Sequence, residues 1–191
     1  MTNKKENKIN LTSGTLLIAE PFLEDPHFRR SVVLVCEHHN KGTIGFILNK
    51  PVGMNVSNLL SGFPDFDSEI FYGGPVQTDT IHYVHSKGDL IEDSVEIGPG
   101  LYWGGKFDQL KFCVENGLIT PFEIRFFVGY SGWGEGQLNE EMTYMSWMTS
   151  AVDKNYVLGN STEAKLLWKT VLEHEGDVYS VIAQMPLPQW N

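Results

Sequence analysis

A chain of 191 residues, of which 41% are hydrophobic and 20% charged, is long enough to form one domain with a sizeable buried core. The formal net charge of −10 argues against specific nucleic-acid binding, because affinity for DNA depends chiefly on lysine and arginine side chains that neutralise phosphates. No apolar run approaches the roughly 20 residues of a membrane-spanning helix, and the N-terminal MTNKKENKIN lacks the apolar region of a secretory signal. These features predict a cytoplasmic protein that does not associate with membranes.

The first half of the chain is predicted to be mostly β-sheet, because short runs rich in strand-forming residues alternate with proline and glycine. These strands are expected, in chain order, at TLLIAE (15–20), SVVLVCE (31–37), TIGFILNK (43–50), EIFY (69–72), TIHYVHS (80–86) and SVEIG (94–98). The second and third form a central hairpin, and the second is apolar at nearly every position, as in a strand buried on both faces.

The second half is predicted to mix helices and strands. Helical spacing of apolar residues appears in KFDQLKFCVENG (106–117), in the stretch from Gln137 to Thr149, and in TEAKLLWKTVLEHEG (162–176) after a possible N-cap at Asn160. PFEIRFFVG (121–129) and NYVLG (155–159) are expected to be strands.

The chain is therefore predicted to belong to the α+β class. We expect a disordered tail over residues 1–12 and a single domain over 13–191, with a mixed, mostly antiparallel β-sheet packed with about three to four helices.

The glycine-rich stretch FVGYSGWGEGQ (127–137) could in principle cradle a phosphate. Its glycines follow neither the Walker spacing nor the dinucleotide-binding spacing, and Glu135 places a negative charge where an anion would bind. We expect instead a tight turn from a strand to a helix. Trp133 is predicted to pack one face against the central hairpin and to keep an accessible edge, through which it could contact a partner.

Histidines and a serine suggest two kinds of catalytic site. His38 and His39 are adjacent, and His82 and His85 are an odd number of residues apart in a strand, so neither pair forms a local chelate. No metal or other cofactor is predicted, although a metal site assembled from distant residues stays open. Ser131 in GYSGW partly matches the G-x-S-x-G nucleophile motif but lacks its last glycine, so a catalytic serine with His38 or His85 remains an alternative.

The two cysteines, Cys36 and Cys113, lie in the apolar stretches VLVCE and LKFCVE. Neither has a partner at the spacing of a redox or zinc motif. Both are predicted to be buried free thiols, as is usual in a cytoplasmic protein.

Several stretches together resemble a known family. They are GTLLIAEPFLEDPHFRRSVVLVCEHHNKGTIGFILNKP (14–51), FYGGPV (71–76), His85 within IHYVH, FFVGYSGWGEGQLNEE (126–141) and Trp147. In this order, over nearly the whole chain, they are similar to the AlgH-like family of bacterial proteins, also called the YqgE family. The resemblance implies a cytosolic, single-domain protein of mixed α and β structure without an established biochemical role. The family name also carries a genetic link to transcriptional regulation of alginate synthesis, which implies at most an indirect regulatory role, because this sequence has no DNA-binding motif.

Transferring the family's recurrent residues to this sequence gives a candidate binding surface. Several of them are polar and fall at strand ends or at a helix start, where a site would gather. The candidate residues are Arg30, His38, Asn49, His85, Tyr130, Ser131, Trp133 and Gln137. Family members commonly carry proline or alanine where this chain has Glu135, which further disfavours an anionic ligand at the glycine-rich stretch.

The function predicted from the sequence is that of a non-enzymatic module that binds a protein or a small molecule and acts as a regulator. The main reason is that the sequence presents no carboxylate pair, metal-binding motif or complete nucleophile motif. The alternative is an undiscovered hydrolase whose site is assembled near Arg30, His38, Asn49 and Ser131.

Overall fold

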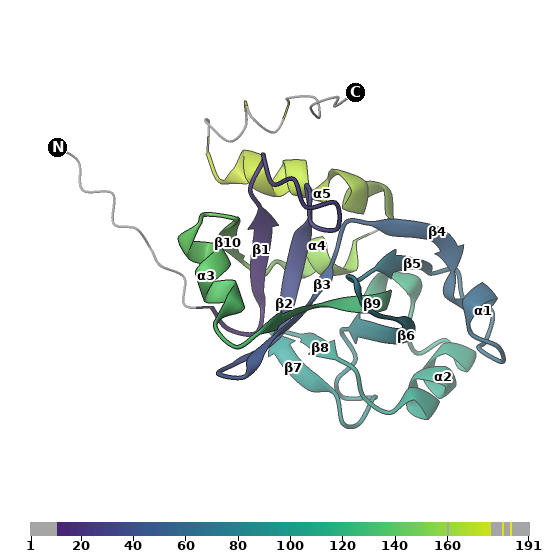
Figure 1. Ribbon diagram of the computed structural model, residues 1–191. Helices are drawn as coiled ribbons and strands as arrows, with labels where there is room; N and C mark the ends of the chain where they lie inside the picture. The colour runs from purple at the N-terminus through teal and green to yellow at the C-terminus, as the bar shows by residue number, and fades with distance from the viewer. Residues whose placement is uncertain (1–10, 160, 177–180, 182–183, 185–191) are drawn as a thin grey trace.

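The computed structural model describes residues 11–159, 161–176, 181 and 184, and within them the chain forms a ten-stranded sheet flanked by helices (Figure 1). The strands are β1 (Thr15–Ala19), β2 (Val32–His39), β3 (Gly42–Ile47), β4 (Pro51–Asn55), β5 (Glu69–Tyr72), β6 (Val76–His85), β7 (Val95–Gly98), β8 (Leu101–Trp103), β9 (Ile124–Gly134) and β10 (Trp147–Ala151). The helices are α1 (Val56–Leu59), α2 (Phe107–Glu115), the 3₁₀ turn η1 (Pro121–Glu123), α3 (Gln137–Thr143), α4 (Lys154–Leu158) and α5 (Ser161–His174).

The strands follow the order β10-β1-β2-β3-β9-β6-β8-β7, and β4 and β5 lie off this path. Neighbouring strands are antiparallel except for β5 and β9, which pair in parallel with Ile70 opposite Phe126. Strand β9 is long enough to pair with β3 through its second half and with β5 and β6 through its first half. It therefore joins the two halves of the sheet.

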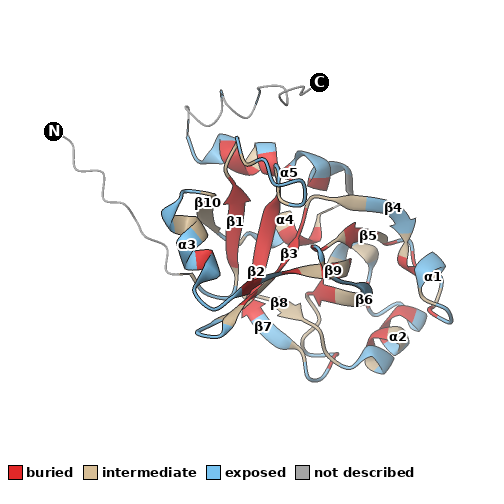
Figure 2. Cartoon of the chain, viewed as in Figure 1, coloured by how far each residue is buried: buried red, intermediate tan, exposed pale blue. Residues whose placement is uncertain are grey.

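Helices cover both faces of the sheet, so its strands send alternate side chains into different cores. In β1, Leu16 and Ile18 pack with α4 and α5, while Leu17 packs with α3 on the opposite face. In β9, Phe127 joins the core beneath α4 and α5, and Phe126 joins the core beneath α1 and α2. Figure 2 shows the buried residues concentrated in β1, β2 and β3, as expected for strands covered on both faces.

The predicted fold class is confirmed: the structure is an α+β single domain with a mostly antiparallel sheet. The described residues contain helices α1 to α5, slightly more than the three to four expected. The additional helices, α1 and α4, are too short to show a helical spacing of apolar residues in the sequence. Of the predicted tail, the structure describes only Leu11 and Thr12, and the predicted N-cap Asn160 lies outside the described residues.

Two predicted elements were wrong. NYVLG is helix α4, in which the Asp153 side chain accepts a hydrogen bond from Asn155 N at 2.8 Å and so caps the first turn. The helix predicted from Gln137 to Thr149 ends at Thr143, and Met145 then adopts a left-handed conformation with φ 58°. Beyond it the chain extends as β10 and pairs with β1, so the last part of the predicted helix is a strand.

The glycine-rich stretch is not a loop for most of its length. Residues 129–134 belong to β9, and Gly134 pairs with Gly42 of β3. The turn is confined to Glu135 and Gly136, where Gly136 has φ 72° and precedes α3. Gly129 within β9 allows close approach of backbones, since a Cβ there would collide with the carbonyl oxygens of Gly74 and Val76.

Candidate functional site

Glu141 holds two tryptophans in the core, Trp133 of the glycine-rich stretch and Trp147 of β10. One carboxylate oxygen, Oε2, accepts hydrogen bonds from Trp133 Nε1 at 2.9 Å and from Trp147 Nε1 at 2.8 Å, and Oε1 accepts from Gln137 Nε2 at 3.0 Å. The Phe28 ring stacks on Trp133 with centroids 5.7 Å apart. Trp133 is only 4% exposed, so the expected accessible edge was wrong: its polar edge is turned inward to Glu141.

Tyr130 and Ser131 lie on the central part of β9. Ser131 is fully buried and donates its hydroxyl hydrogen bond to Gly73 O at 2.9 Å. Tyr130 packs its ring edgewise against His82 at a centroid distance of 5.8 Å. The serine hydroxyl joins β9 to the turn that follows β5, and no solvent reaches it as placed.

Arg30 and Asn49 meet at one end of the central hairpin. Asn49 Oδ1 accepts from Val32 N at 2.9 Å, and Asn49 Nδ2 donates to Arg30 O at 2.8 Å, which fixes the turn that enters β2. Arg30 has a left-handed backbone with φ 52°, and its guanidinium lies 5.0 Å from the centre of the Trp168 ring. Arg30 thus packs against α5, and Asn49 fixes the chain that enters the hairpin.

His38 lies at the opposite end of the same hairpin, paired with Thr43, whereas Val33 pairs with Ile47 near Asn49. The five residue-to-residue steps from Val33 to His38 span roughly 17 Å of extended strand. The structure therefore brings Arg30 and Asn49 together but separates them from His38.

His85 has both ring nitrogens engaged. Nδ1 accepts from Lys87 N at 3.1 Å, so Nε2 carries the proton and donates to Gly104 O at 2.9 Å. Ser94 Oγ is 3.2 Å from Nε2, the protonated nitrogen, so His85 has no lone pair with which to deprotonate this hydroxyl. Burial lowers the pKa of His85, with the Gly104 hydrogen bond acting in the opposite direction, so the ring is neutral near pH 7.

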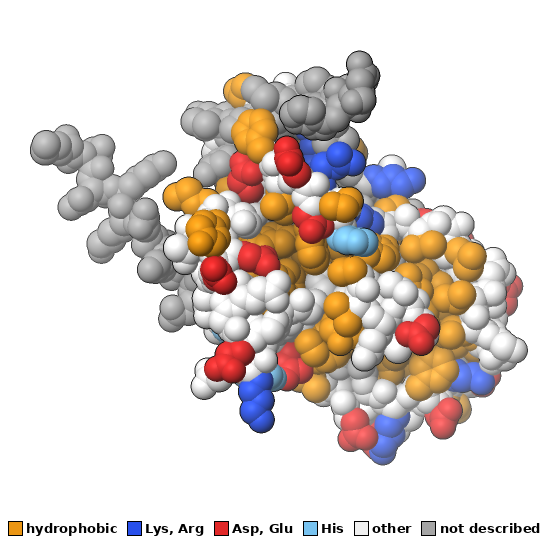
Figure 3. Space-filling model, in the orientation of Figure 1, with side chains coloured by type: hydrophobic (Ala, Val, Ile, Leu, Met, Phe, Trp, Pro, Cys, Tyr) orange, Lys and Arg blue, Asp and Glu red, His pale blue; other side chains and the backbone are white. Residues whose placement is uncertain are grey.

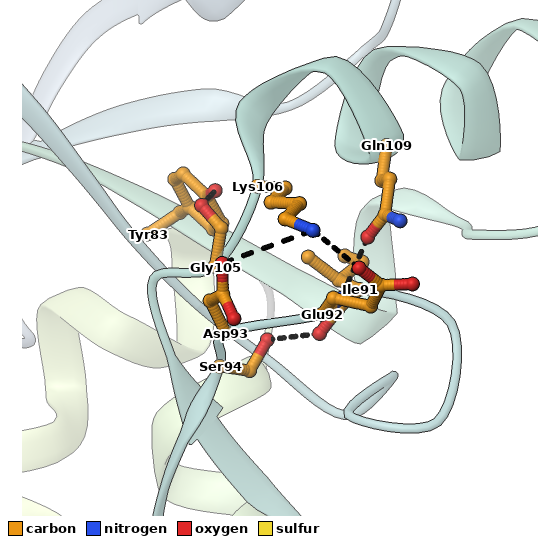
Figure 4. Close-up of polar contacts among 8 residues, drawn as sticks. All are labelled: Tyr83, Ile91, Glu92, Asp93, Ser94, Gly105, Lys106 and Gln109. Atoms are coloured by element: carbon orange, nitrogen blue, oxygen red, sulfur yellow. Dashed lines mark hydrogen bonds and ion pairs between the residues drawn. The ribbon is translucent and has the colours of Figure 1, made fainter.

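The loops beside His85 are joined by further polar contacts (Figure 4). Ser94 Oγ donates to Ile91 O at 2.6 Å, Glu92 N donates to Gln109 Oε1 at 2.6 Å, and Lys106 pairs with Glu92. These contacts fasten the loop before β7 to the start of α2. They indicate a structural role for this part of the predicted surface.

Two cavities in the described part of the chain border turns of the sheet, and the smaller of them adjoins the glycine turn. It has a volume of about 270 Å³ and lies between the β2–β3 turn and the start of α3. His38 lines it, and His38 Nδ1 is 2.7 Å from Thr43 Oγ1. Gln137 lies nearby and accepts from Gly134 N at 3.0 Å through Oε1. Of the predicted residues, His38 is the one that lines this cavity.

The larger cavity has a volume of about 430 Å³ and contains none of the predicted residues. It is built from β4, the start of β5, η1, the start of β9 and the end of α4. Its lining residues are Gly53, Met54, Asn55, Asp67, Ser68, Glu69, Phe71, Pro121, Phe122, Ile124, Arg125 and Gly159. We call it the Arg125 cavity.

Arg125 is a buried cation on the wall of this cavity, only 2% exposed. Its guanidinium lies 4.4 Å from the centre of the Phe71 ring and donates to Leu48 O at 2.9 Å, to Tyr156 O at 3.4 Å and to Gly159 O. Among the described residues, no carboxylate lies within ion-pair distance of it. Carbonyl dipoles and an aromatic face therefore stabilise a charge that an anion would ordinarily balance.

The electrostatics of Arg125 follow from this burial. Desolvation lowers its pKa to about 9, and Glu163, acting at longer range, opposes the shift. The guanidinium is still charged at neutral pH.

A sequence signal for this residue existed. In the strand IRFFVG, Arg125 and Phe127 share one face, and an arginine beside a core phenylalanine is unusual in an otherwise apolar strand. Its cavity was not predictable, because the lining residues come from four separate segments of the chain.

Comparison with known proteins identifies the family. The model of the AlgH-like family matches residues 16–180. The chain belongs to the AlgH-like family. Its relatives include a UPF0301 protein of Chlorobaculum tepidum, 43% identical over 100% of both chains, and one of Chlorobaculum parvum, 43% identical over 95% of this chain and 96% of the relative.

Two solved structures resemble this AlgH-like chain. The solution structure of the AlgH protein from Pseudomonas aeruginosa has 27% identity and a TM-score of 0.72, covering 95% of this chain and 98% of that one. The crystal structure of protein DIP2367 from Corynebacterium diphtheriae has 20% identity and a TM-score of 0.76, covering 92% and 93%, and shares the fold.

Within the described part of this AlgH-like chain, no group of three or more histidine, cysteine or acidic side chains is placed to hold a metal ion. None of the helices described there is long and apolar enough to cross a membrane. Both cysteines are free and buried, as predicted.

Proposed function

We propose that this AlgH-like protein is a non-enzymatic binding module that holds a small molecule in the Arg125 cavity. The observation that carries the proposal is the buried guanidinium of Arg125 on the wall of a cavity of about 430 Å³. This volume falls within the roughly 300–1,000 Å³ usual for small-molecule sites.

The energetic argument concerns desolvation. Removing a cation from water costs several kcal/mol, and three carbonyl groups with one aromatic face offset only part of that cost. A ligand with a group that accepts hydrogen bonds, bound beside Arg125, would supply the missing stabilisation. Functional sites commonly retain such unfavourable charges because the ligand compensates them.

The surroundings of the cavity favour binding for a second reason. Phe122 and Met54 line it and are 70% and 42% exposed, so the cavity offers apolar contact surface beside its polar groups. Figure 3 shows hydrophobic side chains gathered on the right of the displayed face, over β4, α1 and α2. Apolar walls with a few placed polar groups are typical of small-molecule sites.

The hydrolase alternative has less support. Ser131 is buried and bonded to Gly73 O, and His38 lies at the far end of the hairpin from Asn49. A catalytic serine and its base must come within hydrogen-bond distance of each other and of a substrate. These residues as placed do not supply that arrangement.

The test is ligand capture by equilibrium dialysis of the purified protein against a metabolite extract, with bound compounds identified by mass spectrometry. The Phe122→Ala variant should retain less ligand, because Phe122 lines the cavity and its exposed ring can be removed without emptying the core. Phe112→Ala is the matched control, since Phe112 is 58% exposed on α2 and does not line the cavity.

Wild type and Phe112→Ala are expected to enrich the same compound, and Phe122→Ala to lose most of it. Equal retention by all three proteins, or no enriched small molecule with wild type, would refute the proposed site.

A further inference from the structure

The Arg125 cavity carries opposite charges on different walls. Ile70 of β5 lies opposite Phe126 of β9 in parallel register, so the preceding residues, Glu69 and Arg125, both face away from the α2 core. Glu69 and Arg125 therefore project from neighbouring strands onto one face of the sheet, and both line the cavity.

These two charges do not neutralise each other. Glu69 Oε1 accepts a hydrogen bond from Gly53 N at 2.7 Å, and Arg125 donates to carbonyl groups at Leu48 and Gly159. No ion pair between Glu69 and Arg125 occurs in the described part of the chain. Each charge is held by backbone groups on its own side.

A second carboxylate strengthens the acidic wall. Asp67 also lines the cavity, and its Oδ1 accepts from Asn55 Nδ2 at 3.1 Å. Glu69 is half-buried and Asp67 is exposed, so the acidic wall lies toward the opening and Arg125 lies at the buried side. The cavity is thus polarised from its mouth to its floor.

This polarity selects among ligand charges. An anion bound at Arg125 would be repelled by the carboxylates of Glu69 and Asp67. A cation bound at these carboxylates would be repelled by the guanidinium of Arg125. Like charges at short range repel strongly at the effective dielectric constant of about 20 usual near a protein surface. A molecule with one charge of each sign meets a favourable partner at both ends.

Resting on the proposed function, we infer that the cavity binds a zwitterionic α-amino acid with an apolar side chain. Its carboxylate lies toward Arg125, its ammonium group lies toward Glu69 and Asp67, and its side chain packs on Phe122 and Met54. The polar lining fixes the orientation, and the apolar lining provides contact area.

The test compares ligands that differ by one charge, using calorimetric titration near neutral pH. The probes are L-leucine with 3-methylbutylamine and 4-methylpentanoate, and L-phenylalanine with 2-phenylethylamine and 3-phenylpropionate. For at least one of the two amino acids, we expect binding about tenfold or more tighter than for its amine and its acid, because each lost group forfeits a charge-assisted hydrogen bond.

A charge-removing variant gives a second readout. Glu69→Gln keeps an oxygen for Gly53 N, so the β4–β5 connection is preserved. It should weaken amino-acid binding about tenfold and strengthen binding of the matched acid, since one repulsive charge is gone. Glu96→Gln is the control, because Glu96 is exposed on β7 and does not line the cavity.

Two outcomes would overturn the inference: for both amino acids, an amine or an acid that binds as tightly as the amino acid itself, or no binding of either amino acid at millimolar concentration. If metabolite dialysis still shows ligand lost with Phe122→Ala but kept with Phe112→Ala, the proposed function stands and only the ligand class fails. If dialysis also captures nothing, both fail.

Discussion

Replacing Trp133 with alanine tests whether the glycine-rich stretch is core or contact surface. The ring is 4% exposed, and emptying such a site usually costs about 3–5 kcal/mol of unfolding free energy. Ring contacts with Phe28 at 5.7 Å and Trp147 at 5.9 Å add about 0.5–1.5 kcal/mol each, whereas Glu141 keeps its bond to Trp147 and is not left unpaired. We therefore expect a loss at the upper end, about 4–5 kcal/mol, and a fall in Tm of roughly 10–20 °C.

The assay is urea unfolding followed by far-ultraviolet circular dichroism, with a parallel thermal melt. Trp133→Phe separates the two contributions, because it keeps an aromatic ring but removes the hydrogen bond to Glu141, and should lose about 1.5–3 kcal/mol. Tyr144→Ala is the control for an exposed aromatic residue, since Tyr144 is 74% exposed, and should change stability by about 0.5 kcal/mol or less. A Trp133→Ala protein within about 1 kcal/mol of wild type would refute the core assignment.

Four further predictions follow from charge, burial and backbone geometry. The protein, with a net charge of −10, should not bind duplex DNA specifically, and a sequence-dependent, salt-sensitive gel shift at submicromolar protein would contradict this. Cys36 and Cys113 are buried, and burial raises the pKa of both thiols. A thiol reagent should therefore label them slowly in the native protein and fast in urea, and equal labelling rates would contradict this prediction. Burial lowers the pKa of His82 and His85, so as pH falls these histidines take up protons more readily in the unfolded chain than in the folded one. The two histidines therefore contribute fully to stability above about pH 6.5, and this contribution declines at lower pH. Urea unfolding that shows equal or greater stability at pH 5.5 than at pH 7.5 would oppose this. Gly74 has φ 150° and packs against the backbone of β9, so Gly74→Ala should cost at least about 2–3 kcal/mol, and an unchanged urea midpoint would be inconsistent with that contact.

Much of the fold could be predicted because local sequence and tertiary environment agree. The apolar runs at 15–20, 31–37 and 43–50 became β1, β2 and β3, which are buried on both faces and leave little choice of register. The helix at 106–117 is α2, with Gly117 in the left-handed conformation at φ 66° just after its end.

The errors arose where distant contacts decide the structure. Trp147 was assigned to a helix because its neighbours have helical spacing, but pairing with Ala19 makes it a strand residue. Trp133 was expected to keep an accessible edge, and it is buried because Glu141 bonds its ring nitrogen and Phe28 stacks on its ring. The alternation in IRFFVG places Arg125 correctly, yet the cavity next to it depends on four segments that only the folded chain brings together.

The pairing of β1 with β10 has a consequence for synthesis of the protein. All five residues of Thr15–Ala19 are buried, and their outer edge is covered by Trp147–Ala151, from the far end of the described domain. While a ribosome makes the intervening chain, β1, β2 and β3 can form a hairpin sheet, but its apolar edge has no partner. Chains released before Trp147 is made would expose the unpaired edge of β1 to one another. Synthesis of the chain through Ala151 supplies β10, which covers this edge and prevents edge-to-edge association.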